Sequence, residues 1–299
     1  MANGVDLSLL PAPEVIDDIS FEAVLADMKA DLVARHPDIA TVIALESEPA
    51  VKILEVAAYR ETLLRSRYND EARALLLAHA TGADLDHIGT TYYQEARLLV
   101  SAGNPDADPP TLDVWEADDA YRNRLALKPE SYSVAGPTDA YTFHALSASG
   151  QVKSVSVSSP QPGTTLIYVL SQTGSGIPDA GLLATVAAAL NPGTVRPLSE
   201  EVLVQAATVV DYAIDVDLVL FPGPSTEPVL AAAEAALAQL AAAYHVLGAD
   251  PAYSAFAAAA HRPGVKRAII NSPPAGIVCG PGEAPYCTAI AVRIAGVEE

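Results

Sequence analysis

Residues 82–89 read GADLDHIG and predict a sharp corner between two helices. The first glycine can adopt the left-handed conformation that often follows the last turn of a helix, here a helix expected over residues 72–80. Asp84 can then cap a second helix, in which Leu85 and Ile88 share one face because they are three residues apart. The pattern therefore favours a turn that sets the angle between two helices.

The same eight residues allow a second interpretation, a metal site. Asp84, Asp86 and His87 are residue types that bind metals, but their spacing fits no standard ligand set. We interpret the aspartates instead as helix caps and buried hydrogen-bond acceptors. We expect no metal and no cofactor in this protein.

The first 130 residues read as a helical region. Ser20 can cap a helix that ends before Pro37, since the residue before a proline avoids helical backbone. Pro49 suits the first turn of a following helix. Two long helices are therefore expected ahead of the corner.

A loop and one more helix are expected after the corner. Residues 104–110 (NPDADPP) form a loop by composition, and their alternating acidic residues lack the glycine and glutamate of a calcium loop. Residues 116–127 predict a charged helix. In it Asp118 and Arg122 are four residues apart, the spacing of a surface ion pair rather than of a catalytic pair.

From residue 136 the pattern changes to alternating helices and strands. Helices are predicted over residues 138–149, between Asp179 and Asn191, and over residues 226–247 and 251–260. Strands are predicted over residues 152–157, 166–170, 202–206, 209–220, 265–271 and 288–294, with a turn at residues 161–163.

A short internal repeat lies in this half. Residues 141–159 and residues 253–272 each read as a helix, a glycine, a Val-Lys pair and a strand that ends in serine before proline. The repeat suggests a duplicated module, although any helix–strand–turn–strand unit gives a similar match. The predicted fold class is α+β, a helical N-terminal region followed by two small α/β modules with mainly antiparallel strands. The expected domains are residues 1–130 with an N-terminal arm, residues 131–207 and residues 208–299.

The charge balance excludes some classes of partner. The formal net charge is -20, from 37 acidic and 17 basic residues, so neither nucleic acid nor an anionic membrane is an expected partner. We expect no secretory signal, because the first 15 residues lack a basic and an apolar region, and no membrane-spanning segment. The two cysteines, Cys279 and Cys287, are too few for a disulfide framework. The sequence allows two alternatives for them, two reduced thiols or one disulfide that closes a loop.

Catalytic signatures are missing from the sequence. It contains no Gly-x-Ser-x-Gly, no phosphate loop, no His-Glu-x-x-His and no Cys-x-x-Cys, and its six histidines are scattered. Two carboxylates meeting in a pocket could still act as a general acid and base. We expect a protein without enzymatic activity and without catalytic residues.

Four segments resemble the baseplate assembly protein J family of contractile phage tails. Residues 82–89, followed by Arg97, resemble its Gly-x-x-Leu-Asp-x-Ile/Leu-Gly signature, and residues 118–125 its Tyr/Phe-Arg-x-Arg-Leu element. Residues 133–146 resemble the opening of a family helix, and residues 195–198 a junction in the middle of the domain. The structural and interface candidates that follow are Gly82, Asp84, Leu85, Asp86, Ile88, Gly89, Arg97, Tyr121, Arg122, Arg124 and Arg196.

The resemblance implies a role in assembly. Family members are thought to pair as two copies with one copy of the neighbouring tail protein I, and six such wedges form a ring around the central hub. The implied partners are thus a second copy, tail protein I, a W-type wedge or sheath-initiator subunit and the hub. The implied location is the virion tail baseplate, after assembly in the host bacterial cytoplasm. A tail-derived particle such as a tailocin would use the same subunit.

Two other functions compete with this interpretation. A carboxylate-dependent hydrolase of the tail tip would need a deep pocket with convergent carboxylates of shifted pKa. A receptor-binding module would be rich in β-structure and in surface aromatics, and only 6% of the residues are aromatic.

Overall fold

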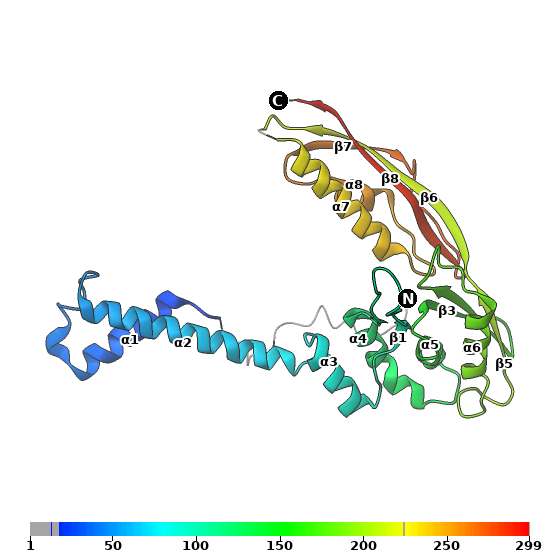
Figure 1. Ribbon diagram of the computed structural model, residues 1–299, viewed down its shortest axis with the longest axis horizontal. Coiled ribbons are helices and arrows are strands. Elements are labelled where there is room, and N and C mark those ends of the chain that lie inside the picture. The colour runs from blue at the N-terminus through cyan, green and yellow to red at the C-terminus, as the bar shows by residue number, and fades with distance from the viewer. Residues whose placement is uncertain (1–12, 14–17, 224, 299) are drawn as a thin grey trace. The chain divides into compact units, whose positions relative to one another are not determined.

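The computed structural model describes residue 13, residues 18–223 and residues 225–298. The chain divides into two compact units, one within residues 18–96 and the other within residues 97–298 (Figure 1). The first unit is helical and the second combines helices with small sheets. The predicted α+β class is therefore confirmed.

The first unit is a helical hairpin. Its helices are α1 (Phe21–Arg35) and α2 (Pro49–Ala74), with the short 3-10 helix η2 (Pro37–Ile39) between them. The Ser20 hydroxyl accepts a hydrogen bond from the Ala23 amide, and Pro49 occupies the first turn of α2, both as expected. Helices α1 and α2 run side by side (Figure 1) and enclose a small apolar cluster around Leu25 and Ala58.

One predicted helix boundary is wrong. Residues 72–80 do not form a separate helix, because α2 continues without a break from Pro49 to Ala74 and gives way to turns at residues 75–80. No proline or glycine interrupts this stretch, and side-chain pairs one turn apart, such as Arg67 with Glu71 at 2.8 Å, support a continuous helix.

The second unit begins with a small hairpin and a helix. Strands β1 (Leu99–Ser101) and β2 (Val114–Trp115) pair antiparallel across the predicted loop. They are followed by α4 (Asp118–Leu127) and the 3-10 helix η4 (Lys128–Tyr132). Gly150 lets the next segment approach this hairpin closely, since a side-chain carbon there would lie 2.5 Å from the Leu99 carbonyl oxygen.

A three-stranded sheet with two helices follows. Its elements are α5 (Thr138–Ser147), β3 (Val152–Gln161), β4 (Thr164–Ser171), α6 (Ala180–Leu190) and β5 (Glu201–Ala206), and the strand order is β3-β4-β5. Helix α6 begins where the Asp179 carboxylate accepts from the Leu182 amide. Buried residues of α5, β4 and α6, including Tyr141, Ile167 and Val186, share one core.

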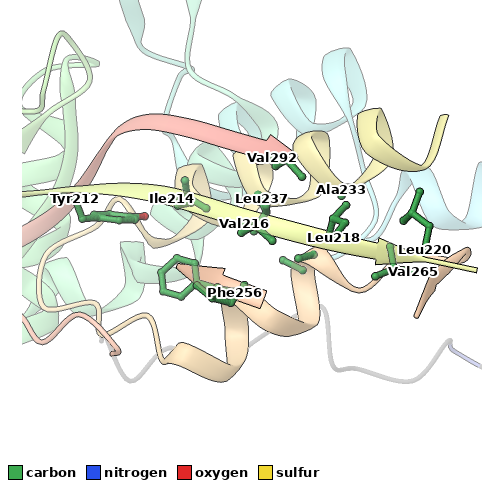
Figure 2. Packing of buried hydrophobic residues seen from close by; sticks show 14 residues of the cluster. Tyr212, Ile214, Val216, Leu218, Leu220, Ala233, Leu237, Phe256, Val265 and Val292 are labelled. Atoms are coloured by element: carbon green, nitrogen blue, oxygen red, sulfur yellow. The ribbon is translucent and has the colours of Figure 1, made fainter. Parts of the chain in front are cut away.

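A second three-stranded sheet completes the chain. Its elements are β6 (Thr208–Leu220), α7 (Glu227–Tyr244), α8 (Tyr253–Ala260), β7 (Val265–Ser272) and β8 (Glu283–Val297), in the order β7-β6-β8. Alternate residues of β6, among them Val216 and Leu218, point toward Leu237 of α7 and Phe256 of α8 (Figure 2). This period of two, set against helices on one face, is what the apolar alternation of the strand predicts.

Both sheets are mixed. In each, the central strand has one antiparallel neighbour (β3 or β7) and one parallel neighbour (β5 or β8). The chain connections differ, because β4 follows its antiparallel neighbour whereas β6 precedes its own. Duplication of the two modules, and the bounds of the three predicted domains, stay predictions.

Candidate functional site

The corner at residues 82–89 forms two short helical segments, α3 (Gly82–Ile88) and the π-helix η3 (Gly89–Tyr93). Leu85 and Ile88 are buried on one face, as expected. Gly82 has a φ of +52°, the predicted left-handed conformation, although it begins α3 rather than following a helix directly. Packing of the Leu85 face therefore holds the corner.

The predicted role of the aspartates at this corner is wrong in part. Thr81 rather than Asp84 is the N-terminal flanking residue of α3, because the helix starts three residues earlier than expected. Asp84 lies in the first turn and is exposed, so it is not a buried acceptor, while Asp86 is half-buried. A carboxylate in a first turn still interacts favourably with the helix dipole.

A buried ion pair organises the start of the second unit. Arg124 of α4 donates to Glu116 twice, from Nε to Oε1 at 3.0 Å and from Nη2 to Oε2 at 2.7 Å. The two side chains are only 1% and 10% exposed. The Leu98 amide also donates to Oε2 of Glu116. We name Arg97, Glu116, Asp118, Tyr121 and Arg124 the arginine junction.

Arg97 completes the arginine junction from the other side. Its Nη1 donates to the Glu116 carbonyl oxygen at 2.6 Å, and its Nη2 lies 2.7 Å from Asp118. The guanidinium groups of Arg97 and Arg124 lie 5.0 Å and 5.2 Å from the centre of the fully buried Tyr121 ring. Cation–π attraction thus adds to the hydrogen bonds.

Arg122 of the same helix pairs with an exposed carboxylate. Its Nη1 is 2.6 Å from Asp119, whose side chain is almost fully exposed. Such a pair contributes little to stability, about 0.2–1 kcal/mol. The sequence predicted Asp118 as the ion-pair partner of Arg122. In the structure Asp119 pairs with Arg122, and Asp118 pairs with Arg97.

A second polar junction joins α5 to the segment before β5. The Tyr141 hydroxyl donates to the Glu200 carboxylate, and Arg196 donates to the backbone carbonyls of Asn191 and Glu200. Gly136 leaves room for that carboxylate, since a side-chain carbon there would lie 3.0 Å from it. We name Gly136, Tyr141, Arg196 and Glu200 the tyrosine junction. Burial, and then the Glu200 carboxylate, raise the pKa of Tyr141 well above its ordinary value.

The two junctions bring together segments that the sequence motifs singled out separately. Arg97, Tyr121 and Arg124 meet in one, and residues 133–146 meet residues 195–198 in the other. The sequence interpretation missed both carboxylates, Glu116 and Glu200. No local signal identifies them, because each pairs with a residue that lies elsewhere in the chain.

The hydrogen bonds of these two junctions hold segments of the chain in place. Glu116 accepts three hydrogen bonds from the protein, and Glu200 accepts the Tyr141 hydroxyl, so neither carboxylate resembles a proton acceptor waiting for a substrate. Removing one partner from a buried pair leaves an uncompensated charge, which makes the geometry specific.

Within residues 18–223 and 225–298, no three His, Cys, Asp or Glu side chains gather closely enough to hold a metal ion. Within the same ranges no helix is both long and apolar enough to cross a membrane. Cys279 and Cys287 are free, and burial raises the pKa of both thiols, which keeps them protonated and weakly reactive.

The chain is similar to known baseplate proteins. Residues 46–104, which include the corner and Arg97, match the baseplate J-like N-terminal domain. Residues 133–206, which include the tyrosine junction, match the baseplate J-like central domain. The chain is 43% identical to "Baseplate protein J" of Escherichia phage P2 over 300 residues, or 99% of each chain. The chain therefore belongs to the baseplate J-like family, the structural proteins of the phage tail baseplate.

Proposed function

We propose that this protein is a wedge subunit of a contractile tail baseplate, in a phage or in a tail-derived particle. It pairs with a second copy of itself and with the neighbouring tail protein I. It also contacts a W-type wedge or sheath-initiator subunit and the central hub. The wedges assemble in the host cytoplasm, form a ring around the hub and rearrange when the sheath contracts. The role is structural and not catalytic.

One observation supports this proposal most strongly, an exposed apolar stripe on α2. Ile53, Val56, Leu63, Leu64 and Tyr68 are each 44–71% exposed. At about 100° per residue they occupy one side of the helix. Ala58, on the other side, packs against α1. We name the five exposed residues the α2 stripe.

The α2 stripe is too apolar to remain in water at no cost. The cluster between α1 and α2 is small, so the hairpin buries little of its own apolar surface. Covering an exposed Leu or Ile side chain contributes roughly 1.5–3 kcal/mol. Apolar residues at three- and four-residue spacing are typical of a helix-bundle seam, which supports α2 of a second copy as one partner.

The test is to co-express the chain with the products of the genes on either side and to measure mass by native mass spectrometry. Two copies with one neighbour is the expected unit. A strictly monomeric chain that captures no neighbour would contradict the wedge role. Leu64→Lys should weaken assembly without unfolding the chain, whereas Ser66→Lys, at an exposed polar position of the same helix, should leave it intact.

A further inference from the structure

The two sheets of the second unit are linked by a histidine. His245 follows α7 of the second sheet, and its Nδ1 lies 2.9 Å from the Lys153 Nζ atom on β3 of the first sheet. Its Nε2 lies 3.1 Å from the Ser175 carbonyl oxygen, in the segment after β4. One imidazole ring therefore spans the contact between the two sheets.

The partners of the ring determine where its protons lie. A carbonyl oxygen can only accept, so Nε2 of His245 carries a hydrogen and donates it to Ser175. The Lys153 ammonium can only donate, so Nδ1 must accept with its lone pair. The contact thus requires a neutral imidazole. A proton on Nδ1 would place an N–H group against an ammonium group 2.9 Å away.

The nearest charged group around the ring is the Lys153 ammonium, which opposes a positive charge on the imidazole. Lys153 faces it from β3, the Tyr286 ring from β8 at 5.2 Å between centroids, and Ser175 through its backbone. Within residues 18–223 and 225–298, no carboxylate forms an ion pair with His245 or Lys153. Burial, and then the Lys153 charge, lower the pKa of His245, and burial lowers that of Lys153.

The ring also has little room to move. A side-chain carbon on Gly176 would lie 2.9 Å from Nε2 of His245, so the chain passes directly against the ring. Two residues further on, the Leu247 amide donates to the Ser154 hydroxyl of β3 at 3.3 Å. Loss of the histidine contact would therefore disturb a second bond between the same two elements.

We propose that His245 is an acid-sensitive latch between the two sheets, closed while its imidazole is neutral and released when Nδ1 takes up a proton. This inference goes beyond the wedge role and does not depend on it. The sign follows from the surroundings, because the folded protein disfavours the charged ring. The latch holds above the ordinary histidine pKa of about 6.5 and is lost as the pH falls below it.

Hydrogen–deuterium exchange of the full chain tests the latch. The reporter is the peptide around residues 245–250, which contains the Leu247 amide. After correction for intrinsic rates, its protection should fall by about tenfold between about pH 7.5 and about pH 5. His245→Gln keeps a donor and an acceptor but cannot be charged, so it should show no such fall. His261→Gln, at an exposed histidine of the same unit, should behave like the unaltered chain.

A second variant keeps the test decisive if His245→Gln does not fold. Lys153→Met removes the facing ammonium, so the ring should take up its proton at higher pH and the loss of protection should shift upward. The proposal is overturned if the unaltered chain keeps its protection in acid, if His245→Gln loses it equally, or if Lys153→Met leaves the midpoint unchanged.

Discussion

Replacing Arg124 by methionine tests whether the arginine junction fixes the start of the second unit. Methionine fills a similar volume but donates nothing to Glu116, whose carboxylate loses both guanidinium donors and keeps the Leu98 amide. Because Glu116 stays buried and charged, the cost is that of breaking a buried pair, about 3–5 kcal/mol of unfolding free energy.

A second substitution separates the charge from the packing. Adding Glu116→Gln to Arg124→Met removes the orphaned charge and retains an oxygen for the Leu98 amide. The double variant should therefore recover at least about 1.5 kcal/mol relative to the sum of the single losses. Asp119→Asn is the matched control. It removes the exposed carboxylate from Arg122 and should cost at most about 1 kcal/mol.

The chain offers a suitable probe for this measurement. Trp115 is the only tryptophan, directly precedes Glu116 and is half exposed, so its fluorescence reports unfolding at the junction. Urea titrations at unchanged slope convert midpoint shifts into free energies. The reasoning fails if Arg124→Met costs no more than Asp119→Asn, or if the losses of the two junction substitutions simply add.

Three further predictions test other contacts. Leu85→Asp should cost about 3 kcal/mol or more, because it buries a charge at the corner, whereas Asp84→Ala should be nearly silent; protease sensitivity of residues 82–96 measures both. Gly282→Ala should reduce the free energy of unfolding by about 1–3 kcal/mol, since the new carbon would lie 2.6 Å from the Tyr168 ring. A lower melting temperature would show this loss. Tyr212→Phe should be neutral or stabilising, because the buried hydroxyl has no hydrogen-bond partner within residues 18–223 and 225–298. Burial raises the pKa of Tyr212 to about 12, so stability should fall as pH rises from about 10 toward that value, and less so in the variant.

Local rules predicted the elements well wherever one residue decides a boundary. Ser20 caps α1, Pro49 opens α2 and the turn at residues 161–163 joins two strands. The same rules failed for Asp84, where a glycine in left-handed conformation begins the helix three residues earlier. Helix propensity likewise predicted a separate helix from residue 72, and it could not show that α2 continues to Ala74.

Long-range pairing could not be read from the pattern. The parallel neighbours β5 and β8 look no different in sequence from antiparallel strands, because both alternate apolar residues with a period of two. The arginines of the arginine junction were singled out by resemblance. Their partner Glu116 was not, since a carboxylate ahead of a helix is also what a solvent-exposed first turn contains.

The polar contacts of the second unit share one physical property. Apolar cores such as the one around Val216 tolerate small changes of angle, because burial is not directional. A bidentate pair such as Arg124 with Glu116, or a ring held at both nitrogens such as His245, is satisfied in only one geometry. A buried ion pair adds little net stability, but loss of one partner leaves a buried charge uncompensated and is strongly destabilising. Contacts of this kind suit a subunit that must meet its neighbours at a fixed angle. Hence substitutions at these contacts should change assembly geometry before they prevent folding.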